Sequence, residues 1–165
     1  MAEEKEKRID KFMKEYDKLR RKYALPEFRK LNEEFEIEKI ADKRTEFPLR
    51  NIRRGIEQRA ELFLKMLEEF INPTFASIAS LTILKSFSEK DRGLIKRCYE
   101  NIVDLILSSA VLETGYDEKK EAEYIKFATK LWGETNKDLN VLMTDAQRIW
   151  KKKIEEEKVE FKFSG

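Results

Sequence analysis

The chain has 165 residues, with 35 basic and 33 acidic side chains and a formal net charge of +2. A length near about 150 residues favours one domain, so we expect residues 1–165 to form a single unit. Charged residues make up 41% of the chain, but another 41% are hydrophobic, which excludes an intrinsically disordered chain. The near-neutral balance produces no overall field that would mark a nucleic-acid or membrane binder.

The residue types that are absent exclude several chemistries. The sequence contains no His, which removes the usual general base, the usual transition-metal ligand and both the Ser-His and the Cys-His mechanisms. Its one cysteine, Cys98, cannot form an intrachain disulfide or a Cys-rich zinc site, and we expect it to be a small buried hydrophobe. The glycines are isolated, so no phosphate-binding loop occurs. We therefore expect no metal and no cofactor.

Residues 1–24 predict an amphipathic helix. Apolar residues recur there in steps of three and four, and basic residues end the segment, as the helix dipole favours. The apolar stripe is narrow and heptad-like, which is typical of a seam that docks on another helix. The helix on which this seam docks belongs to the rest of this chain, to a second copy or to another protein. In the last two cases residues 1–24 would be peripheral to the bundle. The stripe, which is the candidate partner-binding surface, comprises Ile9, Phe12, Tyr16, Leu19 and Tyr23.

The next segments contain helical patterns of different strength. Pro26 ends the first helix, and a weaker apolar pattern follows over residues 28–35. Residues 37–47 fit neither a helical nor a strand period. From Pro48 a strong helical pattern returns and continues to Asn72.

Three polar residues mark later helix starts. Asn72, which precedes Pro73, and Ser88, which precedes acidic residues, are typical N-caps, and Asp117 caps the last helix after a short turn. Between the last two lie residues 94–112, the most apolar segment, which we expect to be the central helix of the core.

The C-terminal third predicts one long helix and a different tail. Gly115 is placed to be a left-handed C-cap residue, and the helix after it extends from residue 118 to about residue 153, with Trp132 and Trp150 on its inner face unless Gly133 breaks it. Residues 159–163 alternate apolar and charged side chains like a short strand. The whole chain is thus predicted to be an all-α, single-domain bundle of five or six helices, with a long C-terminal helix and a short extended tail over 155–165.

The densest basic cluster is a candidate anion-binding site. Positive charges near a helix N-terminus oppose the helix dipole and repel one another, so they require an anion. That anion is a phosphate of a nucleotide or nucleic acid in one interpretation. In the other, the chain's own acidic stretch over residues 33–38 folds back onto the arginines, and Arg53 pairs with Glu57 one helical turn later. No aromatic residues interleave with the cluster to stack bases, which weakens the nucleic-acid alternative. The cluster comprises Arg50, Arg53, Arg54 and Arg59.

Without His, a metal-dependent enzyme would require carboxylates that hold Mg²⁺, as in helical nucleotide hydrolases. The candidate pairs have cations three or four residues away, which favours ordinary helix-surface ion pairs instead. These pairs are Glu57 with Glu61 and Glu100 with Asp104.

A Lys- and Glu-rich composition is reported for proteins of very hot organisms. Residues 25–28 (Leu-Pro-Glu-Phe) precede an acidic tract, residues 49–53 (Leu-Arg-Asn-Ile-Arg) open a long helix, and Trp150 comes late in the chain. In these features the chain bears a resemblance to small helical proteins from archaea. This resemblance implies a helical fold and brings no activity or site residue with it.

The functional hypothesis is a non-catalytic interaction or assembly module that binds a protein partner or a second copy. The charged N-terminus and the lack of any run of about 18 apolar residues predict a cytoplasmic protein without membrane contact.

Overall fold

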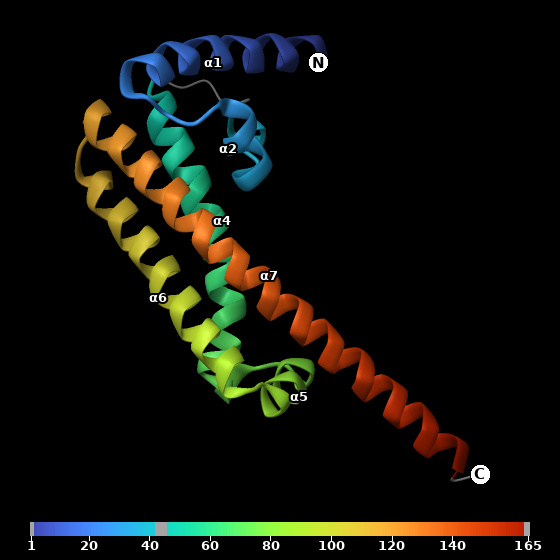
Figure 1. The fold of residues 1–165 in the computed structure, drawn as a ribbon. Coiled ribbons are helices and arrows are strands. Elements are labelled where there is room, and N and C mark those ends of the chain that lie inside the picture. The colour runs from blue at the N-terminus through green and yellow to red at the C-terminus, as the bar shows by residue number, and fades with distance from the viewer. Residues whose placement is uncertain (1, 42–45, 164–165) are drawn as a thin grey trace. The chain divides into compact units, whose positions relative to one another are not determined.

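Figure 1 shows the computed structural model, which describes residues 2–41 and 46–163. Every regular element in these ranges is a helix, so the predicted all-α class is confirmed. The described residues form seven α-helices rather than five or six, because the ambiguous tract after residue 35 contains a short helix of its own. Residues 42–45 of that tract lie outside the described residues. In chain order the elements are α1 (Ala2–Tyr23), α2 (Phe28–Phe35), α3 (Glu38–Ala41), α4 (Pro48–Ile71), the 3-10 turn η1 (Pro73–Phe75), α5 (Ile78–Ser86), α6 (Glu89–Val111), the 3-10 turn η2 (Leu112–Thr114) and α7 (Glu118–Phe163).

The chain divides into two compact units. Unit 1 comprises Met1–Leu62 and Val103–Trp132, and unit 2 comprises Phe63–Ile102 and Gly133–Gly165. Each of the long helices α4, α6 and α7 contributes residues to both units. The prediction of a single domain stays a prediction.

In unit 1, α1 lies beside α2 (Figure 1) and packs on it through aromatic side chains. The rings of Phe12 and Tyr16 each form a T-shaped contact with the Phe28 ring, with centroids 6.1 and 6.0 Å apart. The Tyr16 hydroxyl donates a hydrogen bond to the Pro26 carbonyl at 2.6 Å. Pro26 cannot continue a helix, so the chain turns between α1 and α2. The bond from Tyr16 holds this turn against α1.

The rest of unit 1 is held by α4 and by the antiparallel ends of α6 and α7 (Figure 1). Tyr124 of α7 is buried and donates to the Leu105 carbonyl of α6 at 3.1 Å. Trp132 is 1% exposed and lies under Phe35, with ring centroids 5.4 Å apart. Large apolar side chains from separate helices thus fill one core.

In unit 2 the 3-10 turn η1 and helix α6 begin at the predicted caps, whereas α5 begins after Ser77, whose side chain accepts from the Ser80 amide, and not at Asn72. The Asn72 side chain accepts from the Thr74 amide in η1, and the Ser88 hydroxyl accepts from the Asp91 amide in α6. Asp91 in turn accepts from the Ser88 amide at 2.8 Å, which makes the reciprocal capping arrangement. In unit 1, Asp117 accepts from two amides in the first turn of α7, as predicted.

The C-terminal expectations need three corrections. Gly115 has φ −172°, which is extended rather than left-handed. Trp150 is 37% exposed and does not belong to an inner face. The predicted tail is helical rather than extended over residues 155–163, because α7 passes Gly133 without a break and continues to Phe163, the last described residue.

The physical reason for the helical tail is local. Lys152 and Glu156, and likewise Lys153 and Glu157, pair one helical turn apart, at 3.8 and 3.6 Å. These pairs favour the helix. A short alternating segment without a partner strand has no comparable support.

Candidate functional site

Arg53, at the centre of the predicted arginine cluster, is completely buried on α4. Its Nε donates to Glu121 Oε2 at 2.7 Å, and its Nη2 donates to Glu113 Oε1 at 2.8 Å. Its Nη1 donates both to the Ser109 carbonyl at 3.1 Å and to the Ser109 hydroxyl at 2.7 Å. All three guanidinium nitrogens therefore already have protein acceptors, in charge-assisted bonds of the strong class.

Arg54 and Arg50 join the same network from either side. Arg54 donates to both oxygens of Glu113, at 2.8 and 2.9 Å, in the bidentate geometry that favours a carboxylate. Arg50 donates from Nε to the second oxygen of Glu121 at 3.3 Å, and its guanidinium lies over the Tyr116 ring, 5.3 Å from the centroid. The fold therefore brings three of the four predicted arginines together on α4. The anions that they bind are carboxylates of η2 and α7 in the same chain.

The network is electrically balanced. Glu57 is the third acid, with its Oε2 at 3.7 Å from Arg53 Nη1 and also accepting from the Ser109 hydroxyl at 2.8 Å. Three arginines thus face three carboxylates. Hydrogen bonds from Arg54 and then Arg53 lower the pKa of Glu113 to about 2, so this acid stays ionised at neutral pH. The arrangement connects α4 to η2 and α7 within unit 1, with Arg53 and Glu121 buried and with Arg54 and Glu113 partly exposed.

Sequence reasoning found the arginines but assigned most of them to the wrong acids. Glu57 does approach Arg53, whereas the other partners are Glu113 and Glu121 instead of the stretch over residues 33–38. The only local signal is the acidic first turn of α7, which follows a tight connection. The fourth arginine, Arg59, lines a separate small pocket of about 140 Å³ together with Glu36.

Three of the four acids proposed for Mg²⁺ take part in other interactions. Glu57 belongs to the arginine network, Glu100 pairs with Lys96 at 3.8 Å, and Asp104 accepts from the Ser108 hydroxyl at 3.4 Å. Within residues 2–41 and 46–163, no group of three or more acidic or cysteine side chains is placed to hold a metal ion.

The apolar stripe of α1 is largely used inside this chain. Phe12 and Tyr16 are buried against α2, while Ile9, Leu19 and Tyr23 are half-buried. Burial also raises the pKa of the Tyr16 phenol far above its ordinary value. The partner helix that the stripe predicts is therefore supplied, at its centre, by α2.

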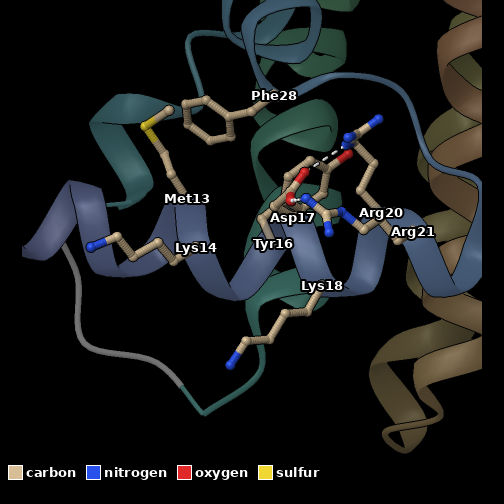
Figure 2. Close-up of a pocket in the computed structure, with 8 residues that line it drawn as sticks. All are labelled: Met13, Lys14, Tyr16, Asp17, Lys18, Arg20, Arg21 and Phe28. Atoms are coloured by element: carbon tan, nitrogen blue, oxygen red, sulfur yellow. Dashed lines mark hydrogen bonds and ion pairs between the residues drawn. The ribbon is translucent and has the colours of Figure 1, made fainter.

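Beside this buried seam, α1 carries a groove of about 600 Å³. Figure 2 shows that Met13 extends towards the ring of Phe28, that Asp17 lies between Arg20 and Arg21, and that Lys18 points away from Phe28. Met13 is 40% exposed, so part of the apolar surface of the groove is open to solvent. The groove is lined by Met13, Lys14, Tyr16, Asp17, Lys18, Arg20 and Arg21 of α1 and by Phe28 of α2.

The charge in this groove on α1 is strongly positive. It holds four cations and one acid, and that acid, Asp17, binds Arg20 Nε at 2.9 Å and Arg21 Nη2 at 2.8 Å. The hydrogen bond from Arg20 is the main reason that the pKa of Asp17 is lowered, so it stays ionised. Lys14 and Lys18 form no ion pair with any other residue that the structure describes. An apolar surface thus borders an excess of three positive charges.

Comparisons with known proteins identify no relative: no family model, curated protein or solved structure matches the chain. Over the described ranges, no helix is both long enough and apolar enough to cross a lipid bilayer.

Proposed function

We propose that this chain is a non-catalytic binding module that holds an acidic segment of a partner protein in the groove on α1. The observation that carries the proposal is the composition of this groove: the exposed apolar side chain of Met13, above the buried ring of Phe28, beside four cations and a single acid. Apolar contact supplies affinity, and complementary charge supplies association rate and selectivity.

The arginine network supports the choice of α1 over α4 as the contact surface. Arg53 is buried, and Arg50 and Arg54 hold carboxylates, so an incoming anion would have to displace Glu113 or Glu121. In the groove on α1, by contrast, Lys14 and Lys18 are exposed. Binding there removes no contact that the core requires.

The test uses a fluorescent amphipathic peptide of glutamate and leucine, titrated with the full chain and followed by fluorescence anisotropy. We expect measurable binding that weakens with rising salt, because exposed charges are screened. The double change Lys14→Glu and Lys18→Glu should raise the Kd by about tenfold or more, since like charges then face each other.

The matched control reverses Lys126 and Lys130. Both lie exposed on α7 at the same spacing as Lys14 and Lys18, and their double change to Glu alters the net charge equally. This control should leave the Kd within about twofold of the unmodified chain. Equal losses in the two double variants, or no binding to the unmodified chain, would contradict the proposal.

A further inference from the structure

A row of cations runs along α1 well beyond the groove. Its members occur at alternating steps of four and three residues, and all lie on exposed side chains of one continuous helix. With about 3.6 residues per turn, such spacing keeps them on one side of the helix, drifting by only about 20° per heptad. At about 1.5 Å per residue, the row spans about 21 Å. Its members are Lys7, Lys11, Lys14, Lys18 and Arg21.

Three of the five cations in this row form no ion pair with another described residue. Lys11 pairs only distantly with Glu15, at 3.9 Å, and Arg21 pairs with Asp17. Among the described residues, Lys7, Lys14 and Lys18 have no ion-pair partner. Water and salt ions screen exposed lysines of this kind, but a row with heptad spacing offers several attractive contacts at once to a ligand with matching negative charges.

We propose that the partner segment is an α-helix whose acidic residues recur at the same alternating spacing and that it lies along this row. The inference rests on the proposed function, because it specifies the partner of the same surface. A second helix is the element whose side chains naturally repeat at this interval, so acids on one face meet successive cations. Its flanking apolar positions face Met13, the exposed apolar side chain of the groove.

The surroundings of the row favour a protein helix over a nucleic-acid strand. A phosphate backbone would make no use of the apolar surface at Met13. It would also need rings on which bases can stack. The nearest aromatic side chains are committed elsewhere: Tyr16 is buried, and the Tyr23 hydroxyl donates to Glu118 at 2.7 Å.

The test compares two alanine-based peptides of about 20 residues, long enough to form isolated helices. Both contain five glutamates and two leucines and are matched in helicity by circular dichroism. In the first, the glutamates follow the spacing of the row, with the leucines beside them; in the second, the same residues are distributed around the helix. We expect the first peptide to bind the full chain about tenfold more tightly, because only its charges can pair simultaneously.

A variant outside the groove connects the difference to the row. Lys7→Gln should weaken binding of the first peptide by about twofold to fivefold and leave the second unchanged, since Lys7 lies about 9 Å from Met13 along the helix axis. Lys130→Gln on α7 is the control and should change neither.

Three outcomes would overturn this inference. Equal affinity of the two peptides would reject the helical register while leaving the proposed function in place. Failure of both peptides to bind would reject the proposed function as well. Tighter binding of a single-stranded oligonucleotide than of the first peptide, in the same salt, would assign the row to nucleic acid instead.

Discussion

Arg53 Nε and Glu121 Oε2 lie 2.7 Å apart, and their side chains are 0% and 1% exposed. A charge pair so thoroughly removed from water is tolerated only when the remaining donors and acceptors are also satisfied. Ser109 and Glu113 accept hydrogen bonds from the remaining nitrogens of Arg53, and Arg50 donates to the other oxygen of Glu121. The basic cluster that looks like an anion site in the sequence is therefore completed within the fold.

Arg53→Met should strongly destabilise the protein. Glu121 would remain buried with only Arg50 as a partner, and breaking a buried pair from one side costs about 3–5 kcal/mol. Arg54→Met is the control, because Arg54 shares Glu113 but is 49% exposed, and surface pairs contribute about 0–1 kcal/mol. Urea unfolding monitored by circular dichroism measures both. Equal losses of unfolding free energy in the two variants would contradict the idea that burial of the Arg53–Glu121 pair causes the destabilisation.

Stability should fall with acid in a window set by Glu113. Its pKa in the folded chain is about 2, against an ordinary value of 4.5, mainly because Arg54 and Arg53 donate to it. A lowered pKa means that the stabilisation is complete above about pH 4.5 and is lost as the pH falls towards about 2. The Glu113→Gln variant should be less stable at pH 7, and its free energy of unfolding should fall less steeply as the pH is lowered below about 4.5. The exposed Glu134→Gln control should retain the slope of the unmodified chain.

Two glycines in long helices should respond oppositely to alanine. A Cβ at Gly55 would lie 2.5 Å from Ile40 Cδ1 and 3.0 Å from Ile37 Cδ1, whereas a Cβ at Gly133 meets nothing within 4 Å. Replacing a helical glycine by alanine otherwise gains about 0.5–1 kcal/mol. We expect Gly133→Ala to raise the melting temperature and Gly55→Ala to lower it. Ile40→Val in the Gly55→Ala background should recover part of the loss, and failure to do so would contradict the close approach of α3 to α4.

The Cys98 thiol should react slowly in the folded protein. It is fully buried, and desolvation is the main cause that raises its pKa to about 11, so little thiolate is present at neutral pH. Labelling with Ellman's reagent should therefore follow unfolding and be rapid only in denaturant. Fast, stoichiometric labelling of the native chain would contradict this burial.

The elements that the sequence predicted well depend on residues close together in the chain. The Asn72, Ser88 and Asp117 caps each need one oxygen and an amide two or three residues away. The same reasoning missed the length of α7, because the alternation over residues 159–163 is visible in the sequence, whereas the continuity of a helix depends on its preceding turns.

The candidate site was less accessible to sequence reasoning. Arg53 and Glu121 are 68 positions apart, and among 33 acidic residues nothing local selects this partner. The groove on α1 raises the same difficulty. Its position follows from which face Phe28 covers, and only the fold places Phe28 against Phe12 and Tyr16.

Asp17 should act as an internal competitor of the partner. It holds Arg20 and Arg21, so a carboxylate of the bound helix must exchange with it or use only the lysines. Asp17→Asn would release both arginines and should strengthen binding of the spaced acidic peptide by roughly two- to tenfold, since each surface pair contributes about 0.2–1 kcal/mol.

The control for Asp17→Asn is Asp10→Asn, which lies one heptad earlier on α1, is exposed and changes the net charge equally. Asp10→Asn should strengthen binding of the spaced acidic peptide less than Asp17→Asn does, because it removes one negative charge without releasing an arginine. The pKa of Asp17 is lowered by its arginine partners, so Asp17 stays ionised across the neutral range and the ratio of the two Kd values should be the same at pH 6 and pH 8. If Asp17→Asn weakens binding, Asp17 instead orients the arginines for the partner, and the competitor role is wrong.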